Sequence, residues 1–158
     1  MDETYIKIKG QWKYLYRAVD KEGNTIDFLL TAKRDKAAAM RFFEKSILNN
    51  GVPEKVSMDK SGANKAAMDQ IIDDKAISIV VPQVKYLNNI VEQDHRAINR
   101  VTRPMLGFKS FRAAKHVLAG IELMHMIRKG QLLLDGIDGM SFADQFYAQP
   151  GLVCLAAG

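Results

Sequence analysis

Residues 2–31 read DETYIKIKGQWKYLYRAVDKEGNTIDFLLT, and this stretch decides the expected fold. Residues 4–9 alternate between apolar and cationic side chains, a period of two that predicts a strand with one buried face. A tight turn at Gly10-Gln11 leads into residues 12–19, which are rich in the aromatic residues that strands favour. After a second, polar turn, residues 25–31 form a third expected strand. The sequence therefore predicts an antiparallel meander.

Beyond the meander, helical and strand patterns alternate along the chain. Asp35 can cap a helix that ends at Gly51. The remaining expected elements are short strands at 53–58 and 76–81 and helices at 61–72, 87–103 and 110–129. This order predicts an α/β fold with a mixed five-stranded sheet flanked by helices, which is the ribonuclease-H-like arrangement. We expect residues 1–130 to form this domain and residues 131–158 to form a peripheral C-terminal tail.

The composition is typical of one globular domain. The 158 residues are 47% apolar and 26% charged. No run approaches the roughly 18–20 apolar residues that span a bilayer, and the first residues do not have the pattern of a signal peptide. The single cysteine, Cys154, excludes an internal disulfide. These features predict a cytoplasmic protein that does not enter a membrane.

The charge is distributed unevenly along the chain, whose net charge is +5. Residues 94–129 carry eight Lys or Arg and only two acids, Asp94 and Glu122. Residues 130–158 carry acids alone. A basic segment of this kind suits a polyanion such as DNA, because phosphate contacts release condensed counterions. A solvated basic surface without a partner is the alternative.

Three carboxylates occupy positions at which they could act together. Asp2 begins the first strand, Asp59 directly follows the strand at 53–58, and Glu92 lies in a later helix, with 32 residues (60 to 91) between it and Asp59. Neighbouring strands lie about 4.8 Å apart, so carboxylates at strand ends can converge if those strands are neighbours, and a helix packed across the edge can add a third. Converging carboxylates select Mg²⁺ or Mn²⁺, and a pair of such ions supports phosphoryl transfer. The alternatives are a terminal residue, a turn aspartate and a solvated helix carboxylate.

The helix that carries Glu92 has two predicted faces. Its polar stripe follows the spacing i, i+3, i+4, i+7 and i+11 and consists of Glu92, His95, Arg96, Asn99 and Arg103. The apolar side, expected toward the core, consists of Leu87, Ile90, Val91, Ile98 and Val101. An acid followed by a basic ridge suits a metal ligand beside a DNA backbone. The alternative is an exposed face on which Glu92 pairs with Arg96. We expect His95 to be a phosphate neighbour or a structural donor.

Several segments resemble bacterial insertion-sequence transposases of the DDE family, which is related in fold to retroviral integrases. The segments are DETYIKIKG at 2–10, YLYRAVD at 14–20, DKSGAN at 59–64, KYLNNIVEQDHR at 85–96 and RPMLGFKSF at 103–111. The resemblance runs from residue 2 to about residue 130.

The resemblance implies a catalytic triad of Asp2, Asp59 and Glu92 that holds two Mg²⁺ or Mn²⁺ ions. It also implies DNA contacts, which we assign to Lys60, His95, Arg96 and Arg103. The implied activity is hydrolysis and strand transfer at the ends of an insertion element, by a homo-oligomer that binds element ends and target DNA.

The sequence departs from this family at three points. In the family a helix-turn-helix region normally precedes the catalytic domain, whereas here only Met1 precedes Asp2. In addition, Asn99 stands where the family has Lys or Arg. Two further hypotheses therefore stay open. The chain could be a truncated, inactive DNA-binding or dimerising remnant, or it could be a ribonuclease-H-like nuclease without joining activity.

Overall fold

The computed structural model describes residues 1–58, 62–82, 89–131 and 140–147. Its sheet has three antiparallel strands in the order β1 (Asp2–Ile8), β2 (Gln11–Val19) and β3 (Thr25–Thr31), which confirms the predicted meander. The first turn lies one residue earlier than predicted, because Ile8 pairs with Gln11. Its two residues, Lys9 and Gly10, have φ angles of 50° and 76°. Positive φ at both positions gives a two-residue turn the twist that matches the flanking strands.

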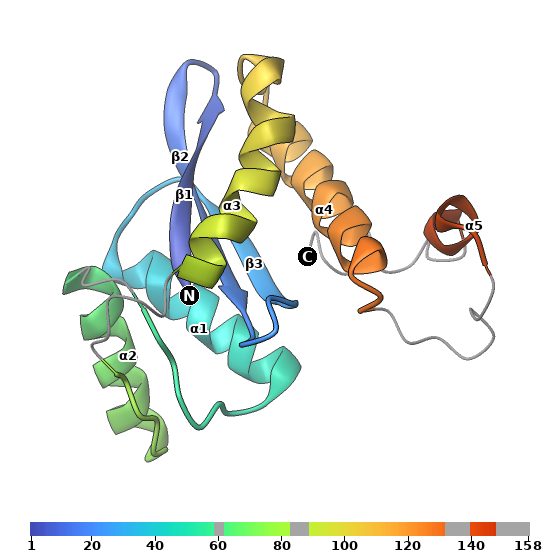
Figure 1. Cartoon of the computed structure of the whole chain (residues 1–158). Helices are drawn as coiled ribbons and strands as arrows, with labels where there is room; N and C mark the ends of the chain where they lie inside the picture. Colours follow the sequence, from blue (N-terminus) through green and yellow to red (C-terminus); the bar gives the residue numbers. More distant parts are fainter. Residues whose placement is uncertain (59–61, 83–88, 132–139, 148–158) are drawn as a thin grey trace.

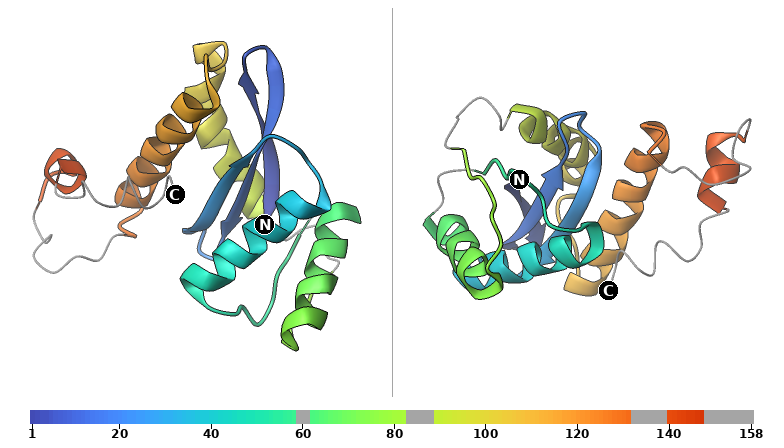
Figure 2. Two further views of the ribbon diagram at one scale, coloured as in Figure 1. Left: turned by 180° about the vertical axis from the view of Figure 1, so that it is seen from behind. Right: turned by 90° about the horizontal axis from the view of Figure 1, so that it is seen from below.

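Helices cover both faces of this sheet (Figures 1 and 2). One face packs against α1 (Lys36–Asn50) and α2 (Gly62–Lys75), and the other against α3 (Asn89–Thr102) and α4 (Phe111–Arg128). The short helix η2 (Arg103–Met105) follows α3, and α5 (Phe142–Tyr147) contacts α4. Of the helices described, none combines the length and the apolar character that a membrane crossing requires.

The capping residue predicted for α1 is in place, and a second helix, α4, has a side-chain cap as well. The Asp35 side chain accepts a hydrogen bond from the Ala38 amide at 2.8 Å, and α1 ends at Gly51. The Ser110 hydroxyl accepts a hydrogen bond from the Ala113 amide at 3.0 Å at the start of α4. Ser61, the first residue of the helix predicted at 61–72, lies outside the described residues.

Two separate apolar clusters form the core, one on each face of the sheet. Tyr16 of β2 packs with Phe42 and Met68 on the α1 and α2 side. Its neighbour Leu15 packs with Ile98 and Leu118 on the α3 and α4 side. Successive side chains of a strand point to opposite faces, so the central strand β2 contributes to both clusters.

The five-stranded sheet of the prediction is not confirmed. Among the described residues, the segments 53–58 and 76–81 contribute only an isolated parallel bridge, with Val56 N–H donating to the Val80 carbonyl at 3.0 Å. The first segment nevertheless lies beside the start of β1, because the Met1 amino group donates to the Ser57 carbonyl at 2.7 Å. Pro53 begins the first segment and Pro82 follows the second, and neither has the amide hydrogen that a longer ladder needs.

Candidate active site

Asp2 is the first residue of β1, and its side chain is partly exposed. Ile6 and Ile8 of the same strand belong to the cluster on the α3 side. Side chains at positions i, i+2 and i+4 share a face of a strand, so Asp2 also faces α3. Its Oδ1 accepts a hydrogen bond from the Glu3 amide at 2.8 Å.

Glu92 lies in the first turn of α3, and its side chain is exposed. The start of α3 lies beside the start of the chain in each view of Figures 1 and 2, and α3 contacts β1. The structure thus brings together the elements that carry Asp2 and Glu92. The other two predicted site residues in this region, Asp59 and Lys60, lie outside the described residues.

Glu3 is a carboxylate next to Asp2 in sequence, but it faces the opposite side of the sheet. One of its oxygens accepts a hydrogen bond from Arg34 Nε, and the other accepts one from Asn64 Nδ2 at 2.8 Å. The side chain is buried. Both oxygens are therefore engaged in a structural contact, which separates the role of Glu3 from that predicted for Asp2.

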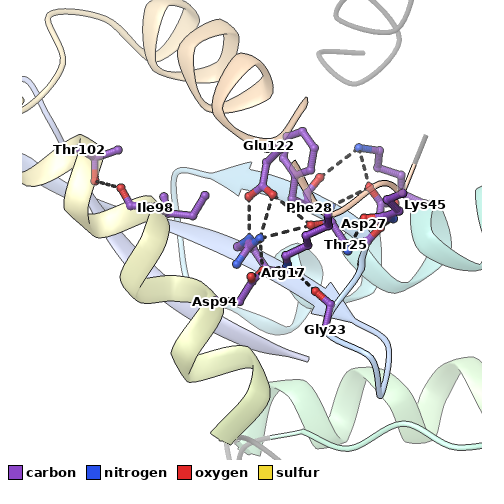
Figure 3. Close-up of polar contacts among 12 residues, drawn as sticks. Arg17, Gly23, Thr25, Asp27, Phe28, Lys45, Asp94, Ile98, Thr102 and Glu122 are labelled. Atoms are coloured by element: carbon purple, nitrogen blue, oxygen red, sulfur yellow. Dashed lines mark hydrogen bonds and ion pairs between the residues drawn. The ribbon is translucent and has the colours of Figure 1, made fainter. Parts of the chain in front are cut away.

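A buried ion cluster joins β2 to both helices on the Asp2 side (Figure 3). Arg17 donates from Nε to Glu122 Oε1 at 2.6 Å and from Nη2 to Glu122 Oε2 at 2.8 Å. The same Nη2 donates to Asp94 Oδ2 at 2.6 Å. Lys129 Nζ donates to the other oxygen, Asp94 Oδ1, at 2.6 Å. Arg17 and Glu122 are fully buried, so solvent does not screen their charges.

The charges in this cluster stabilise one another's ionised forms. Burial alone would lower the pKa of Arg17, but the carboxylates of Glu122 and Asp94 raise it above its ordinary value. Burial alone would raise the pKa of Asp94, but Arg17 and Lys129 lower it overall. Removing one partner would leave an uncompensated charge in the interior.

The cluster is built on the same strand pair and the same helix as the two candidate carboxylates. Arg17 is the partner of Asp2 across the β1–β2 ladder. Asp94 follows Glu92 by two residues in α3. A single guanidinium therefore ties the strand next to Asp2 to the helical turn next to Glu92, and this fixes the rotation of α3 against the sheet.

The face that α3 buries differs from the predicted one. The buried residues recur with helical spacing and are Val91, Asp94, His95, Ile98 and Thr102. The predicted stripe is therefore wrong at His95, and Val101 is 47% exposed instead of lying in the core. Leu87 lies outside the described residues, and the side chain of Ile90 is not described.

His95 is neutral inside the protein. Its pKa is lowered to about 4, and burial is the largest cause. The Arg17 charge also lowers the pKa, and this effect is larger than the opposite effect of Asp94. Its Nε2 has no hydrogen-bond partner among the described residues. A buried, neutral imidazole does not present a charge to a phosphate, so this side chain fits the structural role better than the phosphate contact.

The remaining stripe residues reach the surface. Arg96 and Arg103 are exposed, and Asn99 is partly exposed. Asn99 and Arg103 line an open groove of about 700 Å³ between the end of α3 and the β1–β2 hairpin. Asn99 follows Glu92 by seven residues, which corresponds to about 10 Å along a helix.

Sequence reasoning missed the ion cluster, although a signal for it exists. Arg17 shares a strand face with Leu15, Asp94 lies between Val91 and Ile98 on one helical face, and Glu122 follows Leu118 by one turn. A charge on an apolar face indicates a buried partner. The signal was missed because Asp94 and Glu122 were interpreted only through the net charge of residues 94–129.

The chain belongs to the family of DDE domains, whose sequence model matches residues 1–131. It is 44% identical over 133 residues to the Staphylococcus aureus (strain N315) transposase for insertion sequence-like element IS431mec, an alignment that covers 82% of this chain and 57% of that protein. The identity and coverage are the same for the S. aureus transposase for insertion sequence element IS257 in transposon Tn4003. The chain thus spans 57% of the length of these relatives.

Solved structures agree with the ribonuclease-H-like α/β fold. The chain is similar to the integrase catalytic core domain of HTLV-2 in complex with magnesium, with a TM-score of 0.51 and 13% identity over 93% of this chain and 77% of that one. It is also similar to a chain of the simian T-cell lymphotropic virus intasome in complex with a PP2A regulatory subunit, with a TM-score of 0.52 and 14% identity over 93% of this chain and 45% of that one. At these identities the likeness establishes the fold alone.

Proposed function

We propose that residues 1–130 are the catalytic domain of an insertion-sequence transposase, which hydrolyses phosphodiester bonds at element ends and joins the freed strand to target DNA. The observation that carries the proposal is the contact between β1, which begins at Asp2, and α3, whose first turn carries Glu92, in a chain of the DDE-domain family. Membership of the family and the S. aureus relatives support it.

The donor chemistry of this site fits divalent cations. Asp2 and Glu92 offer carboxylate oxygens at a partly exposed and an exposed position, and hard oxygen ligands suit Mg²⁺ and Mn²⁺. We propose that Asp59 completes the set and that the three side chains hold two ions. When bound, such ions activate a water or a 3′-hydroxyl and stabilise the leaving oxygen. An Mg²⁺ complex is described for the HTLV-2 integrase core.

The residues of the chain supply position and charge. The Arg17 cluster holds α3 against β2 through Asp94, so the helical backbone that carries Glu92 is positioned before DNA binds. Exposed Arg96 and Arg103, together with Lys60, contact DNA phosphates in this proposal. Two acids of the basic segment, Asp94 and Glu122, are neutralised inside the protein, so its other cations dominate the surface.

We further propose that the protein acts as a homo-oligomer that brings two element ends together. Dimeric and trimeric forms are described for the HTLV-2 integrase core. The partners in the proposal are the two DNA ends and a target duplex.

A combined nicking and joining assay tests the proposal. The protein is incubated with Mg²⁺ or Mn²⁺ and a supercoiled plasmid that carries the element ends, or with a pre-cut end and a target plasmid. We expect nicked and joined products that Asp2→Asn, Asp59→Asn and Glu92→Gln each abolish. Asp69→Asn, which changes an exposed carboxylate on α2, is the matched control and leaves the products unchanged.

The outcomes separate the alternatives. Salt-sensitive DNA binding without metal-dependent products would favour the inactive remnant, for which Asn99 in place of a basic residue is the motivating observation. Nicks without joined products would favour a nuclease. Products that survive Glu92→Gln would overturn the assignment of the triad.

A further inference from the structure

The groove beside the β1–β2 hairpin is lined by aromatic and cationic side chains. The hairpin contributes Tyr5, Lys7, Trp12 and Tyr14, whose side chains lie on the sheet face away from α3, and the end of α3 with η2 contributes Asn99 and Arg103 at the edge of β1. Among the described lining residues there is no Asp or Glu. The groove therefore combines π-faces with positive charge, and it is complementary to a polyanion that carries rings.

The aromatic rings are exposed and held in a defined arrangement. Trp12 is 59% exposed and Tyr5 is 49% exposed. Their ring centroids lie 6.4 Å apart at an interplanar angle of 81°, and Lys7 Nζ lies 5.9 Å from the centroid of the Trp12 ring. Large exposed apolar surface in one concave place indicates a binding partner, and here the adjoining charge specifies its chemistry.

Main-chain hydrogen bonds join the hairpin to the segment that follows η2. Phe108 N–H donates to the Lys7 carbonyl, and Lys9 N–H donates to the Phe108 carbonyl, both at 2.8 Å. Gly107 permits this approach, because a Cβ atom at its position would lie 3.0 Å from the Lys7 carbonyl oxygen. The groove is therefore part of the fold rather than a gap between independent segments.

We propose that this groove binds an unpaired segment of a DNA strand, with bases stacked on Trp12 and Tyr5 and phosphates beside Lys7 and Arg103. Aromatic rings stack on base faces, which are hidden in a duplex and accessible in an unpaired strand. The identification of the nucleic acid as DNA rests on the proposed function. Because the groove begins about 10 Å along α3 from Glu92, it would receive the strand that leaves the site of cleavage.

Fluorescence tests the inference directly, because Trp12 is the only tryptophan of the chain. The full chain is titrated with oligothymidylate, and with a duplex of the same length, in EDTA so that no cleavage occurs. We expect the single strand to quench Trp12 fluorescence and to bind more tightly than the duplex. By anisotropy of a labelled oligonucleotide, Trp12→Leu should weaken single-strand binding by about tenfold or more, and Lys7→Gln should reduce the slope of log K against log salt by about 0.7.

Two control variants remove similar groups elsewhere. Phe111→Leu changes an aromatic ring of α4 that is 38% exposed, and Lys65→Gln changes an exposed cation on α2. Both should bind like the wild type. The change at Trp12 removes an exposed side chain, and an unchanged circular dichroism spectrum verifies that the variant is folded.

Three results would overturn the inference. The first is equal affinity of Trp12→Leu and the wild type for the single strand, and the second is tighter binding of the duplex without quenching of Trp12 fluorescence. The third is a Trp12→Leu variant that binds the single strand like the wild type and differs only in its oligomeric state, measured by sedimentation. The last result would assign the groove to a second copy of the chain. Failure of the proposed function has a different signature, since it removes metal-dependent products while single-strand binding in EDTA persists.

Discussion

The two ends of α3 are built differently. Near its start, Asp94 and His95 are buried, and Asp94 pairs with Arg17, which is fully buried together with Glu122. At its other end, η2 and the hairpin leave an open groove, and Leu106 is 87% exposed. About 14 Å of helix separates Asp94 from the groove residue Arg103.

This difference matches the two tasks of the proposed site. Carboxylates that act together must be held in fixed positions before the reaction, which a buried ion cluster achieves. A surface that accepts any base gains more from exposed rings and mobile cations. Substitutions near the start of α3 should therefore reduce folding stability, and exposed substitutions at the groove should change binding instead.

The largest expected effect is at Glu122. Glu122→Leu leaves the buried Arg17 guanidinium with Asp94 as its remaining carboxylate partner, and we expect the free energy of unfolding to fall by about 3–5 kcal/mol. Urea unfolding of the variant and the wild type measures the change. Because whole-domain stabilities are about 5–15 kcal/mol, the variant should unfold at a much lower denaturant concentration.

Two further variants check that the buried pair is the cause. Arg17→Met combined with Glu122→Leu removes the opposite charge as well, so it should regain part of the lost stability. Glu22→Leu breaks an exposed pair with Lys21, whose nitrogen–oxygen distance is 3.5 Å, and should have little effect. A double variant less stable than Glu122→Leu alone would contradict this account.

Acid should weaken the same end of α3 through His95. Its pKa is about 4 in the folded protein and 6.5 ordinarily, so the unfolded chain binds the proton more readily. Stability is therefore fully present above pH 6.5 and is lost as the pH falls toward 4, by roughly 3 kcal/mol in total. The lowered pKa of Asp94 acts only at still lower pH.

Unfolding measured across this pH range in His95→Phe tests the assignment. The variant lacks the titrating group and should show a smaller slope between pH 6.5 and pH 4. His116→Gln, a change of an exposed histidine on α4, should retain the slope of the wild type. An unchanged slope in His95→Phe would assign the effect to other groups, of which His125 also has a lowered pKa.

Local signals in the sequence predicted most of the fold. The alternation in residues 4–9, the Asp35 cap and the helix expected at 110–129 each depend on a few neighbouring residues, and all three are confirmed. The two segments after α1 and α2 form only an isolated bridge in the described residues, because their pairing depends on contacts that short apolar runs do not specify.

The site was less accessible to sequence reasoning. Asp2 and Glu92 could be proposed from spacing and resemblance, but their role together with Asp59 stays a prediction. Arg17 and Glu122 are 105 positions apart, so no periodicity links them. His95 was misplaced because a polar residue on a helix was expected on its polar face, whereas packing against β2 and α4 turned that side inward.

At the groove end, a smaller effect on stability is expected from Gly107→Ala. Gly107 has a φ of 111° and its added Cβ would meet the Lys7 carbonyl. We expect a cost of about 1–3 kcal/mol from backbone strain. Hydrogen exchange should accelerate at the Lys9 and Phe108 amides, whose hydrogen bonds join the hairpin to the segment that follows η2. Gly120→Ala, in α4 and with open space around its Cβ, is the control and should not accelerate it.

The smallest effect should come from Lys129, at the solvent edge of the ion cluster. Its side chain is 27% exposed and its Nζ lies 2.6 Å from Asp94 Oδ1, whereas Arg17 contacts Asp94 from the fully buried side. Lys129→Met should therefore reduce the free energy of unfolding by only about 1 kcal/mol, since solvent screens the charge and Asp94 keeps Arg17. Unfolding at low and high salt measures this. The difference from wild type should shrink as salt is added, while that of Glu122→Leu should not. If Lys129→Met instead lost as much free energy of unfolding as Glu122→Leu, independently of salt, the stability at the start of α3 would depend on the exposed ion pair as much as on the buried one.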